Sequence, residues 1–152
     1  MAITVQSTYA TDYTVGYPGM VANGEVSNRI SRTVEDAAGI AFGKAAFRGT
    51  GDNGCTATPA TGTFMGIVIS DASLPPLTAA TPDIVPQYTS AGLLNEGTIY
   101  VTAGVSVADG DQVYVTSAGV FTNVLTSNTL IPAKFDQTVS SGGVVRLRVT
   151  RS

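Results

Sequence analysis

The 152-residue chain contains no histidine and no tryptophan, and its only cysteine is Cys55. Histidine is the commonest general base in enzymes and the commonest metal ligand, so its absence excludes Ser-His-Asp and Cys-His catalysis. A single cysteine excludes an intrachain disulfide and any site built from several thiolates. We therefore expect that the protein is not an enzyme and that it uses no cofactor and no metal ion.

Charge is scarce as well. Only 12% of the residues are charged, the formal net charge is -3 and the sequence pI is about 4.6. No cluster of Lys and Arg supplies the electrostatic attraction that nucleic-acid binding requires, so we expect no nucleic-acid partner. No stretch approaches 18 consecutive apolar residues, and the N-terminus has no basic start followed by an apolar core. We expect no membrane partner, and we expect the protein to be made and kept in the cytoplasm of the cell that produces it.

The pattern that is present has a period of two residues, which is typical of β-strands. Residues 97–123 hold three short apolar alternations between turn signals, which predict a β-meander. Residues 62–70 are apolar on both faces and predict a central buried strand, and further strands are expected over 29–34 and 144–149. The sequence therefore predicts an all-β fold, a β-barrel or jelly-roll-like sandwich of about eight strands.

The first 28 residues show no sustained period, and Gly and Pro argue against a helix there. We interpret residues 1–28 as an extended N-terminal arm and residues 29–152 as the β-barrel or sandwich body. An extended chain of this length reaches roughly 90 Å, so the arm could contact a neighbouring molecule, although it could also fold back over its own barrel. Seven side chains are the candidate binding residues: Tyr13, Tyr17, Pro18, Met20, Val21, Arg29 and Arg32.

Several motifs suggest chemistry without the context that it needs. Residues 49–54, GTGDNG, match the GxGxxG pattern, but no helix follows to receive a pyrophosphate, so we interpret them as a loop. Asp109 and Asp111 flank a glycine between two predicted strands and are interpreted as turn residues. Arg146 and Arg148 share the outer face of the last predicted strand, where they face solvent or a partner.

Tyr100 and Tyr114 lie opposite the core-facing valines of their strands. They are interpreted as surface pairs within the sheet or as interface anchors. Exposed tyrosines could also stack on sugars, although tryptophan, the best stacking side chain, is absent. A surface glycan-binding β-sandwich module is therefore one candidate function.

Five stretches in order along the chain carry a family resemblance. They are VGYPGMVAN at 15–23, SRTVEDAAGIAFGKAAFRGTGDNG at 31–54, TFMGIVISD at 63–71, GTIYVTAGVSVADGDQVYVTSAGVFTN at 97–123 and IPAKFDQT at 131–138. The succession of a YPG arm, an FG strand, a GDxVYV hairpin and the IPAKF strand resembles the structural cement (capsid decoration) proteins of tailed bacteriophages.

This resemblance implies an all-β body with an arm that sits on the outer surface of an assembled head. It implies a capsid decoration protein that stabilises the virion by bridging subunits of the major capsid protein, and it brings no catalytic residues. The expected partners are the major capsid protein and further copies of the same chain, as a homodimer or a homotrimer.

Overall fold

The structure is a computed structural model, which describes residues 15–59, 62–74 and 82–151. These residues form eleven strands and no helix. The strands are β1 Asn28–Val34, β2 Ile40–Ala41, β3 Ala45–Arg48, β4 Gly54–Thr56, β5 Phe64–Val68, β6 Ile84–Val85, β7 Ser90–Thr102, β8 Gln112–Val115, β9 Phe121–Thr122, β10 Thr129–Phe135 and β11 Val144–Val149. The prediction of an all-β, barrel-like sandwich is confirmed.

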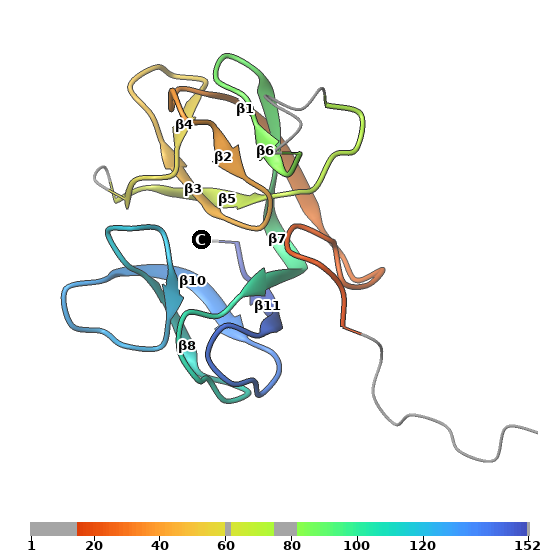
Figure 1. Cartoon of the computed structure of the whole chain (residues 1–152), viewed down its shortest axis with the longest axis vertical. Coiled ribbons are helices and arrows are strands. Elements are labelled where there is room, and N and C mark those ends of the chain that lie inside the picture. The colour runs from red at the N-terminus through yellow and green to blue at the C-terminus, as the bar shows by residue number, and fades with distance from the viewer. Residues whose placement is uncertain (1–14, 60–61, 75–81, 152) are drawn as a thin grey trace, which may run out of the picture.

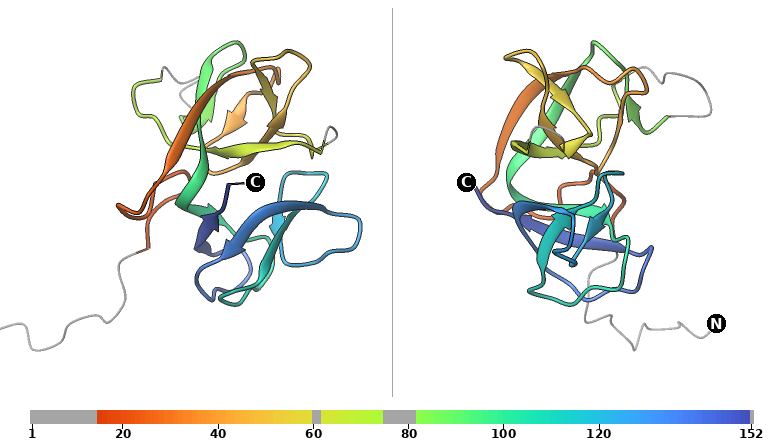
Figure 2. Two further views of the ribbon diagram at one scale, coloured as in Figure 1. Left: turned by 180° about the vertical axis from the view of Figure 1, so that it is seen from behind. Right: turned by 90° about the vertical axis from the view of Figure 1, so that its left-hand side faces the viewer.

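The strands form two lobes that share the long strand β7 (Figure 1). In the N-lobe, residues 28–94, the pairings run β1-β4-β3-β5-β7 and return from β7 to β1, which closes a small barrel. Strands β2 and β6 form a separate two-stranded sheet beside it. Views from behind and from the side show the same division (Figure 2).

The C-lobe, residues 97–149, continues the sheet in the order β7-β11-β10-β8-β9. A bridge between Ala103 and Phe121 then joins β9 to the residue that follows β7 and nearly closes a second circuit. The meander predicted for residues 97–123 is therefore right for its second pair of strands and wrong for its first. The end of β7 pairs with β11, while β8 pairs with β9 and β10.

The wall between the lobes is buried on both faces. On β3, Phe47 packs into the larger core, which reaches through the C-lobe, whereas Ala46 packs into the smaller core inside the N-lobe barrel. Ile67 and Val68 on β5 divide between the two cores in the same way. This arrangement agrees with the prediction that residues 62–70 form a central strand apolar on both faces.

Candidate functional site

Residues 15–27, which precede β1, lie against the edge of β7 and are called the docked segment here. The backbone N–H of Gly19 donates to the carbonyl of Tyr100 (2.8 Å), and the N–H of Tyr100 donates to the carbonyl of Met20 (2.9 Å). A further bridge joins Val21 to Ile99. Of the two possibilities left open by the sequence, this described part of the predicted arm folds back on its own barrel. Residues 1–14, with Tyr13, lie outside the described residues.

The YPG motif forms the tight turn that starts the docked segment. The N–H of Met20 donates to the carbonyl of Tyr17 (3.0 Å), with Pro18 and Gly19 between them. Gly19 has a φ of +88°, so the turn has the type II pattern of proline followed by glycine. A β-carbon on Gly43 would lie 2.7 Å from the β-carbon of Pro18. The YPG and FG motifs are therefore packed against each other, and the contact fixes where the segment leaves the body.

The predicted binding residues of this segment divide by exposure. The side chains of Tyr17 and Met20 are 58% and 36% exposed, so both are available to a partner. Pro18 is partly buried at the contact with Gly43, and Val21 is partly buried against the larger core. Pro18 and Val21 therefore hold the segment in place, while Tyr17 and Met20 face outward.

The two predicted arginines lie on opposite faces of β1. Arg29 belongs to the exposed face, together with Ser31 and Thr33, whereas Arg32 belongs to the partly buried face with Ile30. Side chains an odd number of residues apart on a strand point to opposite faces. Arg29 and Arg32 therefore cannot both contact one flat partner surface.

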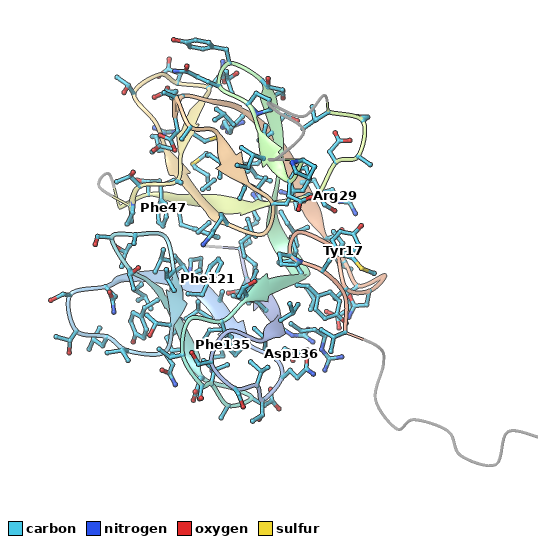
Figure 3. The ribbon with its side chains drawn as sticks, viewed as in Figure 1. Tyr17, Arg29, Phe47, Phe121, Phe135 and Asp136 are labelled. Carbon is cyan, nitrogen blue, oxygen red and sulfur yellow. The ribbon has the colours of Figure 1, made fainter. Side chains whose placement is uncertain are left out.

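Tyr17 and Arg29 line two adjacent grooves on the same side of the molecule (Figure 3). The groove beside Tyr17 holds about 490 Å³ and is also lined by Phe42, while the groove beside Arg29 holds about 330 Å³. Ser70 and Asp71 line both grooves, so the two are continuous. We call the two grooves, together with Met20, the arm-side surface.

The arm-side surface carries one cation, Arg29, and two carboxylates, Asp71 and Asp83. Among the described residues, Arg29 has no ion pair or hydrogen bond through its side chain. Asp71 accepts hydrogen bonds from the hydroxyl (2.6 Å) and the backbone N–H (2.9 Å) of Ser73. These bonds lower the pKa of Asp71, so its carboxyl remains charged. The surface therefore offers an unpaired cation and two carboxylates beside exposed apolar side chains.

A charged clasp holds the other end of the docked segment. The guanidinium of Arg148 on β11 donates to both carboxyl oxygens of Glu25 (2.8 and 3.1 Å) and lies 3.6 Å from Asp136. Desolvation tends to raise the pKa of Glu25, but hydrogen bonds from Arg148 and Thr98 outweigh it and the pKa is lowered. Sequence reasoning placed Arg148 facing solvent or a partner and missed Glu25, because no local pattern links two residues so far apart in the chain.

A second group of exposed apolar side chains lies at the tip of the C-lobe, residues 124–130, between β9 and β10. Leu125 is 67% exposed, and Val124 and Leu130 are also exposed. Leu130 pairs across the strands with Tyr114, so Tyr114 is a surface pair within the sheet. Sequence reasoning missed this tip, although the apolar pair Val124–Leu125 beside polar turn residues is a signal that could have found it.

Tyr100 is only 5% exposed, because the docked segment covers it. A β-carbon on Gly16 would lie 2.5 Å from the Tyr100 ring, so the backbone of Gly16 rests directly on that ring. Tyr100 is therefore an anchor for the chain's own segment, and its face is not available for stacking on a sugar.

The GTGDNG loop wraps around a carboxylate of the same chain. The backbone N–H groups of Thr50 and Gly51 donate to the carboxyl oxygens of Glu35 (2.7 and 2.8 Å), and these bonds lower the pKa of Glu35. The donors that would hold a phosphate in a nucleotide site are thus directed at Glu35. The loop interpretation, rather than a cofactor site, fits this geometry.

The other residues considered for catalysis or metal binding lie in contacts that support the fold. Asp111 accepts hydrogen bonds from the N–H of Ala108 (2.9 Å) and the amide of Asn123 (2.8 Å), as expected of a turn residue. Cys55 is buried, and desolvation raises the pKa of its thiol to about 11. No group of three metal-binding side chains occurs among the described residues. In the same part of the chain, no helix is long and apolar enough to cross a membrane.

The two-lobed fold is also found in a phage capsid. A chain in the structure of the capsid of Myoviridae phage XM1 superimposes with a TM-score of 0.64, covering 97% of this chain and 98% of that chain. The two sequences are 17% identical, so this likeness establishes the fold. No curated protein matches the sequence.

The sequence itself matches the structural cement protein family (E217 gp24/Pam3 gp6) over residues 5–150. The chain therefore belongs to this family, and the resemblance read from its motifs is confirmed. Membership gives the protein a structural, capsid-associated role in a bacteriophage.

Proposed function

We propose that the protein is a non-enzymatic cement protein that binds the outer surface of a tailed-phage head and stabilises it by bridging subunits of the major capsid protein. The observation that carries this proposal is the arm-side surface, where Tyr17 and Met20 are exposed on a segment held to the body by backbone hydrogen bonds, beside the exposed Arg29 of β1. A rigid display of this kind lowers the entropy lost on binding. The family supports the capsid as the partner.

Bridging requires two contact surfaces on one molecule. The arm-side surface supplies one, and the tip of the C-lobe with Val124, Leu125 and Leu130 supplies a second group of exposed apolar side chains. The strand β7 runs through both lobes and connects the parts of the molecule that carry the two surfaces. Many copies on one head would make modest contacts decisive through multivalency.

The binding residues inferred from the sequence receive different roles in this proposal. Tyr17, Met20 and Arg29 contact the capsid directly, and Tyr13 extends the same contact from the segment before residue 15. Arg32 contacts an acidic group in a separate pocket between the two lobes. Assembly as a homodimer or a homotrimer on the head stays part of the proposal.

The test is co-sedimentation with purified heads that lack the protein. The double variant Tyr17→Ser, Met20→Ser should bind at least roughly tenfold more weakly, because hot-spot side chains typically contribute 1–2 kcal/mol or more each. Val26→Ser is the matched control, since Val26 is an exposed apolar side chain of the same segment outside the proposed contact. Equal binding by the double variant and the control would refute the arm-side surface as the contact.

The alternative, a glycan-binding module, is tested on the same protein with a glycan array. The covered position of Tyr100 removes one of the two tyrosines that could have stacked on a sugar. Saturable sugar binding without binding to heads would reverse the proposal.

A further inference from the structure

The two lobes enclose a small pocket whose charges are all of one sign. It holds about 210 Å³ and is lined by Arg32 from β1 and Arg151 from the end of the described chain, with no carboxylate among the lining residues. The other lining side chains come from both lobes: Ile30, Phe64, Met65, Asn95, Pro132 and Thr150. Two like charges in a partly enclosed site repel each other unless an anion lies between them.

Arg32 in this pocket has a donor without an acceptor. Its Nε is buried and has no hydrogen-bond partner among the described residues, while one terminal nitrogen donates to the carbonyl of Ser31 (2.7 Å). A buried donor without a partner costs free energy, and the cost is larger for a charged group. Arg151 likewise has no ion pair among the described residues. The two guanidinium groups of the pocket therefore have no carboxylate partner among the described residues.

A third side chain that lines the pocket, Asn95, can also donate hydrogen bonds. The amide of Asn28 donates to the side-chain oxygen of Asn95 (2.7 Å), which leaves the amide N–H groups of Asn95 free to face a ligand. Ile30, Phe64 and Met65 give the same pocket an apolar wall. Donors on one side and an apolar wall on the other suit a carboxylate carried on a short methylene chain.

We propose that this interlobe pocket binds the carboxylate of a glutamate or aspartate side chain that the capsid protein inserts between the two lobes. The carboxyl oxygens accept from the guanidinium groups of Arg32 and Arg151, and the methylene groups lie against Met65 and Phe64. The pocket is too small for a nucleotide, since ligand sites for molecules of that size usually hold about 300–1,000 Å³. The proposal rests on the proposed function only for the source of the carboxylate.

A side chain bound in this pocket would link the two lobes to each other as well as to the partner. Ile30 and Met65 belong to the N-lobe, whereas Pro132 and Thr150 belong to the C-lobe or follow directly after it. A side chain bound between them contacts both lobes at once. The partner would therefore hold the angle between the lobes, in addition to the contact made at the arm-side surface.

The pocket itself is tested with the isolated full chain and sodium propionate, which has the carboxylate and methylene groups of a glutamate side chain. Proton–nitrogen spectra of the arginine Nε–H groups should show saturable shifts of Arg32 and Arg151, with a dissociation constant on the order of millimolar. Arg29, which is exposed and unpaired, reports non-specific binding, and sodium chloride at equal ionic strength is the salt control. Shifts of Arg32 no larger than those of Arg29 would overturn the pocket.

A chain extended by a Gly-Ser tail after residue 152 separates the ligand from the terminal carboxylate of the chain itself. Propionate binding should be unchanged by the extension. Binding that is found only in the extended chain would assign the pocket to the terminal carboxylate and overturn the proposal.

The source of the carboxylate is tested on heads. Arg32→Gln and Arg151→Gln should each weaken head binding by roughly tenfold, the loss expected for a charge-assisted hydrogen bond. Lys134→Gln is the control, because Lys134 is an exposed cation on β10 outside both proposed surfaces. Arg32→Lys keeps the positive charge. Thermal unfolding of this variant and of Arg32→Gln, each compared with wild type, separates a loss of binding from a loss of folding.

The outcomes distinguish this proposal from the proposed function. If the wild-type chain does not bind heads but propionate shifts Arg32, the proposed function fails and the pocket stands. If the wild-type chain binds heads and Arg32→Gln binds as well as Lys134→Gln, the capsid is not the source. Loss of self-association in Arg32→Gln, without loss of head binding, would assign the carboxylate to a second copy and overturn the capsid as its source.

Discussion

The two lobes share β7 and a closed or nearly closed circuit of strands, yet different forces hold them. The larger core, which fills the C-lobe, is built around large side chains such as Phe121 and Phe135. The core inside the N-lobe barrel contains several small ones, including Ala46, Cys55 and Ala91. Packing of large apolar groups thus dominates one lobe, while the other has less apolar surface to bury.

The N-lobe supplements its small core with carboxylates that accept backbone hydrogen bonds. Glu35 accepts from Thr50 and Gly51, and Asp36 accepts from the hydroxyl of Thr56 and the N–H of Ala57, both at 2.7 Å. These bonds tie the loops of the barrel to the turn after β1. The comparison teaches that stability in the C-lobe should depend mainly on side-chain volume, whereas stability in the N-lobe should depend also on the carboxylates that hold its loops.

The largest expected effect comes from the wall between the lobes. Phe47→Ala should lower the free energy of unfolding by about 3–5 kcal/mol, because a large cavity forms where both lobes meet. Ile40→Val in the N-lobe core should cost only about 0.5–1.5 kcal/mol. Urea unfolding followed by circular dichroism and by tyrosine fluorescence should give one transition for both variants, since β7 is common to the lobes. Two separate transitions in Phe47→Ala would contradict this coupling.

The next effect concerns the attachment of the docked segment. Gly43→Ala should cost more than the about 1–2 kcal/mol of a left-handed non-glycine residue, because Gly43 has a φ of +72° and its new methyl would also collide with Pro18. Gly142→Ala is the matched control, with a φ of +81° and open space around the methyl. Hydrogen exchange of the Gly19 amide should accelerate in Gly43→Ala only. Equal acceleration in the control would show that the contact with Pro18 does not hold the segment.

A smaller effect concerns the carboxylate of Glu35, which holds a loop of the N-lobe. The pKa of Glu35 is lowered from 4.5 in the folded state, so the stability it contributes is present above that value and is lost as the pH falls through the lowered pKa. Glu35→Gln should be less stable than wild type near neutral pH, and the two should converge well below pH 4.5. Urea midpoints across this range measure the difference. A constant difference at every pH would mean that the charge of Glu35 is not what stabilises the loop.

The smallest effect is expected at the clasp between Glu25 and Arg148. Both side chains are about two-fifths or more exposed, so water and salt screen the pair. Arg148→Gln should lower the thermal midpoint slightly at low salt and leave it unchanged in concentrated salt. A large decrease that persists in concentrated salt would show that packing of Arg148, and not its charge, fixes the segment.

Local sequence patterns predicted the positions of individual strands well, but they predicted poorly which strands pair with each other. The period of two residues over 29–34 and 144–149 matches β1 and β11, because alternation depends only on which face of a strand is buried. Pairing order depends on contacts between distant residues, and for that reason the expected meander over 97–123 was right for the hairpin of β8 and β9 but wrong for the pairing of β7. The clasp and the interlobe pocket were missed for the same reason, since their residues meet only after both lobes have formed.

Composition and short-range alternation alone determined that the chain is an all-β protein without histidine, and its motifs placed it in the right family. Those properties depend on residue type and on spacings of a few positions, so they can be read along the chain. Only the folded structure decided that one strand serves two lobes, that Tyr100 lies beneath the docked segment, and that Arg29 and Arg32 face different surroundings. Each of these facts depends on how residues far apart in the chain are brought together, and local sequence patterns carry little information about that.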